Sequence, residues 1–299
     1  MMPWLRRKRS GRSSEPRVAA LTVVRDEAVM LPRWVGYYGG QLGMENLVVV
    51  DDGSTDGSTS DLPCRVIEHE GFPEGRFEAA RMTLVSSIAS QLLQDHDAVI
   101  FTDADEFLLA DPDRFEGLRD YVARRPVPVA AGLGLNVVHH LDHEPPLVAD
   151  QPVLGQRRFA KFVGKMCKPS LKRIDVPWVK ASHGIRAPYV PDRALLMVHL
   201  KFADLDILRR TADLRHQVRE RAGLTEQSAW ARSGDDLAAQ FRSFLNGGPD
   251  APEFDPGLVD LEALVARRGE IFEAAGQRQL RVMADGPLVQ VPRRYHGLV

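Results

Sequence analysis

Apolar runs long enough for buried strands alternate with helix-like segments over the first third of this 299-residue chain, and this alternation restricts the possible folds most strongly. The predicted strands are VAALTVV, the apolar part of ENLVVVDDGS, CRVIEHE, and the apolar part of DAVIFTDADEF. Continuous apolar runs are typical of strands that are covered on both faces. The order β–α–β–(β)–α–β therefore predicts an α/β fold with a mostly parallel sheet flanked by helices.

Two helical segments separate these strands. In the first, apolar residues recur at helical spacing from Leu31 to Leu42, and Gly43 follows as a natural stop. In the second, apolar residues at spacings of seven, four and four run from Phe77 to Leu92. Both segments are therefore predicted to cover the sheet.

The rest of the chain is less regular. We expect strands in VPVAAGLGLNVV and RALLMVHLKF, a helix over 203–222, a linker at 246–257, a helix over 258–275 and a short hairpin through MADGPLV. The predicted organisation is a basic disordered tail at 1–16, one main domain at 17–245, and a linker plus C-terminal helical extension at 246–299.

Composition excludes several classes of protein. The only cysteines, Cys64 and Cys167, lie far apart, which argues against a disulfide scaffold or a cysteine-based zinc site and fits a cytoplasmic location. No apolar run reaches the length of a transmembrane helix, and no apolar stretch follows the basic N-terminus as it would in a signal peptide.

The charges are unevenly distributed. Six of the basic residues lie within 1–17, so the remaining chain is more acidic than the net charge of −2 indicates. An acidic body argues against nucleic acid as a partner. The tail can either stay solvated or touch an anionic surface such as the inner face of a membrane.

Acidic residues follow two of the predicted buried strands. Asp103 and Asp105 end one, and Asp51 and Asp52 end another. Ligands of such sheets bind beyond the carboxyl ends of the strands. In an extended backbone Asp103 and Asp105 would lean to one face, where two repelling carboxylates favour a hard cation such as Mg²⁺ or Mn²⁺. An acidic turn without a metal is the alternative.

Four segments together resemble the family 2 glycosyltransferases of GT-A fold: VVRDEAVMLPRWV, VVVDDGSTDGS, AAR at 79–81, and DADEF. The chain is most similar to a branch with a short first motif, D-x-D-E-F and a late histidine, which here stands in MVHLKF. The resemblance covers 18–110 closely and 160–205 thinly. It implies a GT-A domain that transfers a sugar from a nucleotide-diphosphate-sugar donor to a hydroxyl of a glycan or lipid-linked acceptor, with Mn²⁺ or Mg²⁺, in bacterial surface glycan synthesis.

Nucleotide-binding residues are carried over from the resemblance position by position. Asp52 matches the acid that contacts the base or ribose, and Asp26 and Glu27 match the first nucleotide-binding turn, with Asp26 in place of the usual asparagine. Arg81 matches an arginine near the nucleotide, and Asp103 matches an acid shared with the metal site.

The same resemblance implies a metal site. Asp103 and Asp105 match the metal motif, with Asp105 as the direct ligand. His199 is the candidate third ligand, and His183 is its competitor. Lys201 lies on the same predicted strand face as His199 and can neutralise the leaving diphosphate.

Two further segments carry candidate groups. The loop HHLDHE contains Asp142 and Glu144, which are candidates for the general base if the enzyme inverts, and the alternative is a polar loop without a catalytic part. Lys165 and Lys168 could face phosphate, but we expect a solvated basic face instead.

Other functions fit less well. VIFTDADEF is similar to the nucleophile strand of haloacid dehalogenase phosphatases, but Phe107 stands where that motif needs threonine or valine. The chain has no G-x-G-x-x-G turn after the first strand and no P-loop. A GT-A domain that binds nucleotide or glycan as an inactive adapter remains the non-enzymatic alternative.

Overall fold

A computed structural model of the protein describes residues 15–72, 77–179, 181–221, 235, 248–266, 278–279 and 287–299, with the backbone alone at 214–221, 265–266 and 278–279. Most of the expected tail at 1–16, most of the hairpin at 283–289 and the second half of the helix expected at 258–275 lie outside these residues.

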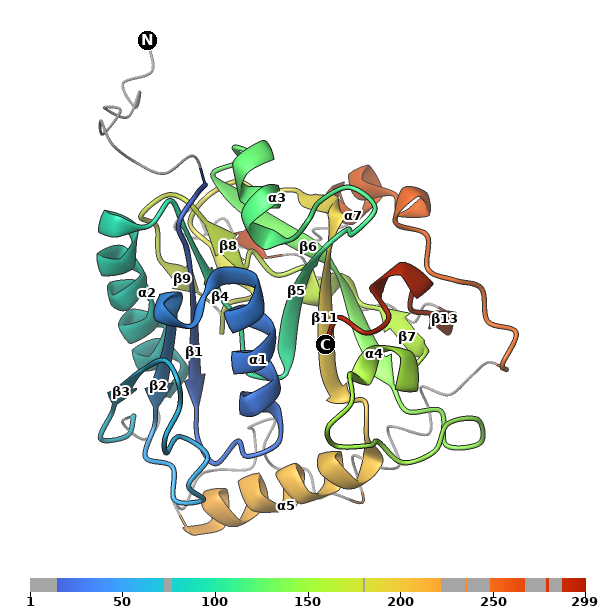
Figure 1. Cartoon of the computed structure of the whole chain (residues 1–299), viewed down its shortest axis with the longest axis horizontal. Coiled ribbons are helices and arrows are strands. Elements are labelled where there is room, and N and C mark those ends of the chain that lie inside the picture. The colour runs from blue at the N-terminus through green and yellow to red at the C-terminus, as the bar shows by residue number, and fades with distance from the viewer. Residues whose placement is uncertain are drawn as a thin grey trace.

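The first half of the main sheet is parallel and is made of the strands that the sequence predicts. β1 (Val18–Val24) lies between β2 (Leu47–Asp51) and β4 (Ala98–Phe101), and β3 (Arg65–Glu68) lies beyond β2. Every pair among these four strands is parallel, so their carboxyl ends share one edge of the sheet (Figure 1). The predicted α/β class with a large, mostly parallel central sheet and flanking helices is confirmed.

Helices α1 (Met30–Leu42) and α2 (Phe77–Asp95) connect these strands. The chain steps outward from β1 to β2 through α1 and returns from β3 to β4 through α2, so right-handed crossovers place the two helices on opposite faces. α1 ends at Gly43, whose φ of 88° is one that glycine adopts without strain. The predicted helix stop is therefore confirmed.

The second half of the sheet is mixed. β8 (Leu171–Lys172) lies between β4 and β6 (Val129–Val138) and is antiparallel to both, so β6 runs in the same direction as β4. β7 (Phe159–Phe162) is antiparallel to β6 and continues the sheet to β13 (Val289–Gln290). The loop after β6 therefore leaves from the same edge as the acidic ends of β2 and β4.

Two strands that branch from this sheet position the candidate site. β11 (Pro191–Phe202) is parallel to β6 and antiparallel to β5 (Glu106–Ala110). β11 was predicted, whereas β5 was not. Because β5 follows β4 after one tight turn, β11 lies directly beside the acidic segment (Figure 1).

The remaining described α-helices and strands are shorter or peripheral. They are α3 (Leu118–Arg124), α4 (Val153–Gln156), β9 (Trp178–Val179), β10 (Gly184–Ile185), α5 (Leu205–Arg221), α7 (Leu261–Ala266) and β12 (Arg278–Gln279), with β9, β10 and β12 forming a small second sheet. The described start of α5 packs Leu205, Leu208 and Ala212 on the ends of β6 and β11. Among the described helices, none has the length and apolar character needed to cross a membrane.

The C-terminal segment joins the main body. Besides α7, which falls within the predicted helical extension, it contains β13, which pairs with β7 and was not expected. Tyr295 is fully buried in the main core, and the carbonyl of Val299 accepts hydrogen bonds from Val153 and Leu154. These residues are thus part of the core, while the predicted division into 17–245 and 246–299 stays a prediction.

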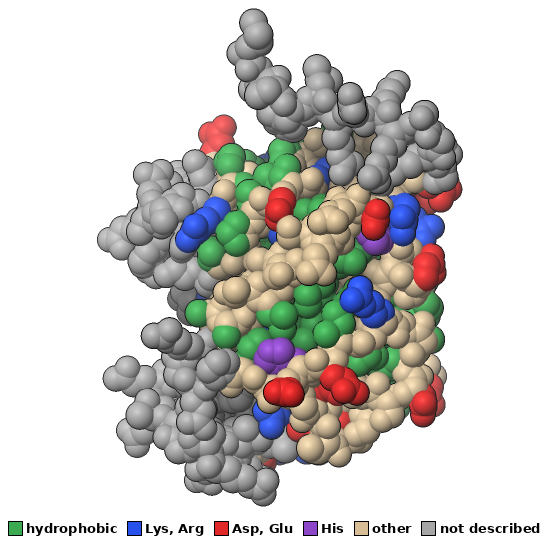
Figure 2. All heavy atoms as spheres, turned by 90° about the vertical axis from the view of Figure 1, so that its left-hand side faces the viewer, with side chains coloured by type: hydrophobic (Ala, Val, Ile, Leu, Met, Phe, Trp, Pro, Cys, Tyr) green, Lys and Arg blue, Asp and Glu red, His purple; other side chains and the backbone are tan. Residues whose placement is uncertain are grey.

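β3 is the outermost strand on one side of the main sheet. Figure 2 turns this side of the molecule toward the viewer and shows apolar side chains gathered in the middle of the face, with charged side chains around them. On β3 itself, Val66 and Ile67 are half-buried between the exposed Arg65 and Glu68. Charged residues at both ends of an edge strand discourage pairing with another chain.

Candidate active site

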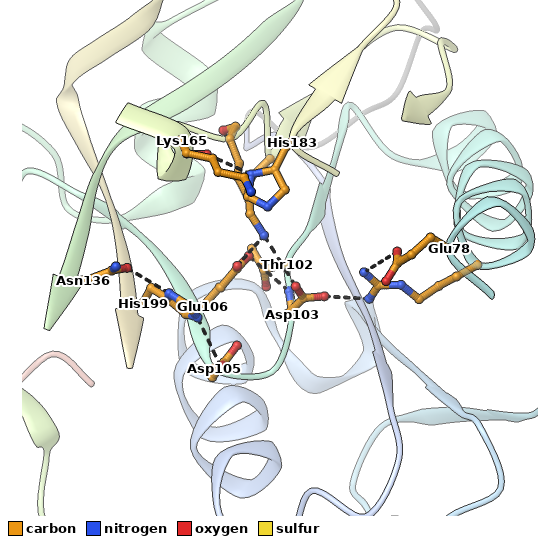
Figure 3. A network of polar contacts seen from close by, with 12 residues as sticks. Glu78, Thr102, Asp103, Asp105, Glu106, Asn136, Lys165, His183 and His199 are labelled. Carbon is orange, nitrogen blue, oxygen red and sulfur yellow. Dashed lines mark hydrogen bonds and ion pairs between the residues drawn. The ribbon is translucent and has the colours of Figure 1, made fainter. Parts of the chain in front are cut away.

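The acidic segment between β4 and β5 is a turn. The amide of Glu106 donates a hydrogen bond of 3.0 Å to the carbonyl of Asp103, which closes the turn. Figure 3 shows that the Asp103 and Asp105 side chains consequently point in different directions. The prediction that an extended backbone places these two carboxylates on one face is wrong, because the chain must reverse here to form β5.

Asp105 instead lies next to His199. The antiparallel register of β5 and β11 pairs Glu106 with His199, and the amide of Leu200 donates to the carbonyl of Asp105 at 2.8 Å. His199 Nε2 is 3.3 Å from Asp105 Oδ2. His199 therefore lies as close to the Asp105 carboxylate as two ligands of one metal ion must.

Asp105, Glu106 and His199 form a group with the geometry of a metal site. One ligand atom of each residue lies within 4.8 Å of the others. Two carboxylates and an imidazole are donors that Mn²⁺ accepts in proteins. Asp103 is not in this group, so the structure does not bring together the full predicted set of Asp103, Asp105 and His199.

The orientation of His199 also fits a ligand. Its Nδ1 lies 2.9 Å from Oδ1 of Asn136 on β6, so Nδ1 donates the hydrogen bond and the lone pair of neutral His199 is on Nε2. That lone pair then faces a carboxylate oxygen of Asp105, and two acceptors this close need a proton or a cation between them. Asn136 was not identified from the sequence.

Asp103 is held by two cations. Arg81 of α2 donates to its Oδ1 at 2.7 Å, and the ammonium group of Lys168 lies 3.5 Å from its Oδ2 (Figure 3). Burial alone would raise the pKa of Asp103, but Arg81 and Lys168 outweigh burial and hold this pKa well below its ordinary value. Asp103 is therefore ionised at neutral pH.

Lys168 also donates to Glu106, and both side chains are almost completely buried, with 3% and 2% of their surfaces exposed. Burial would lower the pKa of Lys168, but the Glu106 and Asp103 carboxylates reverse the effect and raise it. The pKa of Glu106 is raised, chiefly by burial. The expectation that Lys168 lies on a solvated face is wrong, because the fold brings the carboxylates of a distant strand end next to it. Lys165 is exposed, as expected.

His183, the alternative ligand, lies above this network (Figure 3). Its Nδ1 is 2.8 Å from the carbonyl of Lys165, so Nδ1 carries the proton. Burial and then the charge of Lys168 lower the pKa of His183 to about 3. Within the described residues, His183 is not part of the metal-like group. The preceding residues Ala181 and Ser182 have φ of 52° and 66°, a strained geometry that sets this turn.

Asp52 lies at the carboxyl end of β2, where its amide donates to the carbonyl of Val24 at 2.8 Å. The side chain is almost fully buried, and its Oδ1 lies 3.3 Å from Nδ1 of His69, just beyond β3. Burial raises the pKa of Asp52 against the opposing hydrogen bond from His69. The His69 ring stacks on Phe72 at 4.2 Å, which places a flat aromatic surface next to Asp52.

Asp26 and Glu27 follow β1 and meet the turn after β2. Asp26, at a φ of 51°, accepts hydrogen bonds from the amides of Thr55 and Asp56 at 2.6 and 3.2 Å. The amide of Glu27 donates to Ser58 at 3.3 Å. Asp26 thus stabilises the local turn, while its role toward a nucleotide, like that of Glu27, stays a prediction.

The remaining candidates lie at the ends of β6 and β11. Glu144 is buried and accepts hydrogen bonds from the amides of His140 and Arg158, at 2.9 and 2.6 Å, so it anchors its loop. Asp142, in the same loop, is exposed. Lys201 is half-buried with its ammonium group 5.7 Å from the centre of the Phe202 ring. The predicted roles of all three remain to be tested.

Besides Asn136, no role could be assigned to Glu106 or His69 from the sequence, and Lys168 was expected to be solvated. Glu106 and Lys168 become partners only through the fold, because sixty-two positions separate them. His69 carries a weak signal, since it lies near the end of the predicted strand CRVIEHE, which ends at the same edge as Asp52.

Comparisons with known proteins give only distant likenesses. No family model matches the sequence, and neither does any curated protein. Among solved structures, a mannosyltransferase from Pyrobaculum calidifontis (PcManGT) in complex with GDP-Man and Mn²⁺ is 18% identical, with a TM-score of 0.34 over 77% of this chain and 70% of that one. A CMP:2-keto-3-deoxy-manno-octonic acid synthetase complexed with CTP is 13% identical, with a TM-score of 0.31 over 92% and 94%. At TM-scores this low, neither likeness bears on fold or function.

Proposed function

We propose that this protein is a metal-dependent glycosyltransferase that moves a sugar from a nucleotide-diphosphate-sugar donor to a hydroxyl group of a glycan or lipid-linked acceptor. The observation that carries the proposal is the group of Asp105, Glu106 and His199, which lies at the same sheet edge as Asp52. A cation site and a buried carboxylate at one edge of a parallel sheet suit the two ends of a nucleoside diphosphate.

In this proposal, each side chain has a defined part. Asp105 and His199 hold Mn²⁺ or Mg²⁺ with Glu106, and the cation, when bound, neutralises charge on the leaving diphosphate. Asp52 accepts a hydrogen bond from the base or ribose, and Lys201 meets the diphosphate from the end of β11.

Other predicted groups act around these. Arg81 and the carboxylate of Asp103 stay paired and shape the nucleotide side of the site, with Asp26 and Glu27 in the adjoining turn. Of the two candidate general bases, Asp142 is the better one, since both carboxylate oxygens of Glu144 already accept backbone hydrogen bonds. We further propose a role in bacterial surface glycan synthesis, at the inner membrane face, with the basic residues of 1–16 touching the membrane.

A nucleotide-binding adapter without catalysis is the second candidate. One observation favours it: Asp103 and Glu106 are already neutralised by Arg81 and Lys168, so part of the acidic group is satisfied without a metal. Donor hydrolysis that requires Mn²⁺ separates the two candidates, because an adapter turns over no donor.

A thermal-shift screen tests the proposal. The protein is heated with a series of nucleoside diphosphates and nucleotide sugars, either with Mn²⁺ or with a chelator. At a hundred times Kd, binding contributes about 2.7 kcal/mol, so at least one nucleotide should raise Tm by about 5 °C with Mn²⁺ and not with chelator. Equal shifts under both conditions, or no shift with any nucleotide, contradict the proposal.

A further inference from the structure

Glu106 takes part in two arrangements at once. One carboxylate oxygen accepts from the ammonium group of Lys168, while Glu106 also belongs to the group of ligand atoms with Asp105 and His199. Its other oxygen lies 3.4 Å from the amide nitrogen of Asp103, at the edge of hydrogen-bonding distance. The same carboxylate is therefore the point where a lysine and a metal ion would meet.

Because Lys168 and Glu106 are both buried, a metal ion that takes Glu106 away from Lys168 has to overcome an energetic cost. Lys168 and Glu106 are buried to within a few per cent, and a buried charge that loses its partner is strongly destabilising. Arg81, the other cation that pairs with Asp103, also pairs with Glu78 at 3.3 Å, so it does not replace the charge of Lys168 at Glu106. Lys168 thus supplies positive charge to the carboxylates of Glu106 and Asp103 when no metal is bound.

We infer that Lys168 is an internal cation that competes with the divalent metal for Glu106, so that it stabilises the metal-free site and weakens metal binding. This inference rests on the proposed function, because it assigns a positioning residue to the same metal site. On metal binding, Glu106 exchanges a contact with Lys168 for one with the metal, while Asp103 keeps Arg81 and Lys168 as partners.

Mn²⁺ titration calorimetry of Lys168→Met and wild type, with the metal alone as the probe, tests the inference. The variant is expected to bind Mn²⁺ at least tenfold more tightly, a gain of about 1.4 kcal/mol, because a competing charge is removed. Its Tm without metal is expected to fall, and Mn²⁺ is expected to raise its Tm more than that of the wild type.

Two matched variants separate this effect from a general loss of packing. Lys168→Arg keeps the charge and is expected to bind Mn²⁺ as the wild type does. Lys172→Met removes another buried lysine, which donates to the carbonyl of Val176, lies over the Trp178 ring and has Asp175, not a carboxylate of the candidate site, as its acidic neighbour. It is expected to lose stability with unchanged Mn²⁺ affinity.

A double variant covers the case in which Lys168→Met does not fold without metal. In Lys168→Met/Glu106→Gln both buried charges are gone, so the protein should fold without metal and bind Mn²⁺ no more tightly than the wild type. Unchanged or weaker Mn²⁺ binding by folded Lys168→Met overturns the inference and leaves the proposed function standing. Tighter Mn²⁺ binding by the double variant overturns it too. Absence of Mn²⁺ binding by the wild type overturns both proposals.

Discussion

Asp51 and Asp52 are neighbours in the sequence, but their carboxylates have different contacts. Asp51 accepts hydrogen bonds from the amide of Ser54 and the hydroxyl of Thr59, so its carboxylate builds the turn. Asp52 is buried beside His69, with no such turn contact among the described hydrogen bonds. This difference makes Asp51 a natural control for Asp52.

Asp52→Ala is expected to weaken donor binding by about 1.5–3 kcal/mol, the scale of a hydrogen bond to a charged group. Asp51→Ala is expected to lower the free energy of unfolding with little change in donor affinity. Calorimetry with the nucleotide identified by thermal shift measures both. If Asp52→Ala loses only stability and keeps its donor affinity, Asp52 is a turn residue.

Some site residues could be predicted from the sequence, and others could not. Asp52 and Asp105 follow apolar strands, so their place at the sheet edge follows from strand direction alone. His199 also needed the resemblance to a known family. Lys168 could not be predicted, since a lysine in a basic segment is ordinarily solvated and only the distant Glu106 makes its burial favourable.

At the scale of elements, β5 decides where the site forms. Its pairing with β11 brings His199 to the acidic turn, yet only five residues make up the strand. From the sequence, Glu106 and Phe107 belong to the acidic segment that ends the preceding strand, and no separate strand is predicted after them, because no glycine or proline marks the turn before Glu106. This turn between β4 and β5 also explains why the carboxylates of Asp103 and Asp105 point in different directions.

Helix α1 holds the free edge of β5. The amide of Leu108 donates to the hydroxyl of Tyr38 at 2.9 Å, and the hydroxyl of Tyr37 donates to the carbonyl of Leu108 at 2.8 Å. Tyr38 also donates to the carbonyl of Glu106 at 3.3 Å. The hydroxyl groups of the two tyrosines thus form the backbone hydrogen bonds that a neighbouring strand would otherwise form with β5.

Tyr38→Phe should therefore cost about 1–3 kcal/mol of unfolding free energy, because it leaves the buried amide of Leu108 without its acceptor. The ring is retained, so the loss does not come from a cavity. Urea denaturation with an unchanged m-value measures the effect. A loss below about 0.5 kcal/mol, the range of surface substitutions, would show that the hydroxyl does not hold β5.

At the scale of the whole molecule, the two ends of the described chain lie in one core. Val18 and Tyr295 are both fully buried, and Arg294 donates to Asp111 near the end of β5 at 3.0 Å. This return could not be predicted from the sequence, because the last residues have too little periodicity to indicate a partner. The sheet is therefore completed only when the final residues are in place.

Stability should fall as the solution is acidified, partly through His183. Its folded pKa of about 3 lies below the ordinary value of 6.5, so between these pH values the unfolded chain binds more protons and stability rises with pH. His183→Gln is expected to lose less unfolding free energy than the wild type between pH 7 and pH 5. Urea denaturation at the two pH values measures this difference, and an equal loss in both proteins would contradict the assignment.

Below about pH 4, Asp103 adds to the same trend, since its folded pKa is depressed and its contribution is lost on protonation. Glu106 acts in the opposite direction, because its raised folded pKa favours the folded state as pH falls. Comparing wild type with His183→Gln above pH 5 therefore keeps the contribution of His183 separate from that of Asp103.

The central claim is that Asp105 and His199 bind the cation on which donor binding depends. Mn²⁺ titration calorimetry of the wild type, Asp105→Asn, His199→Gln and the control His183→Gln tests it most directly. The wild type is expected to bind one Mn²⁺, and the first two variants at least tenfold more weakly, a loss of about 1.4 kcal/mol or more, with the control unchanged. Wild-type affinity in both Asp105→Asn and His199→Gln, or a loss confined to His183→Gln, would contradict the claim.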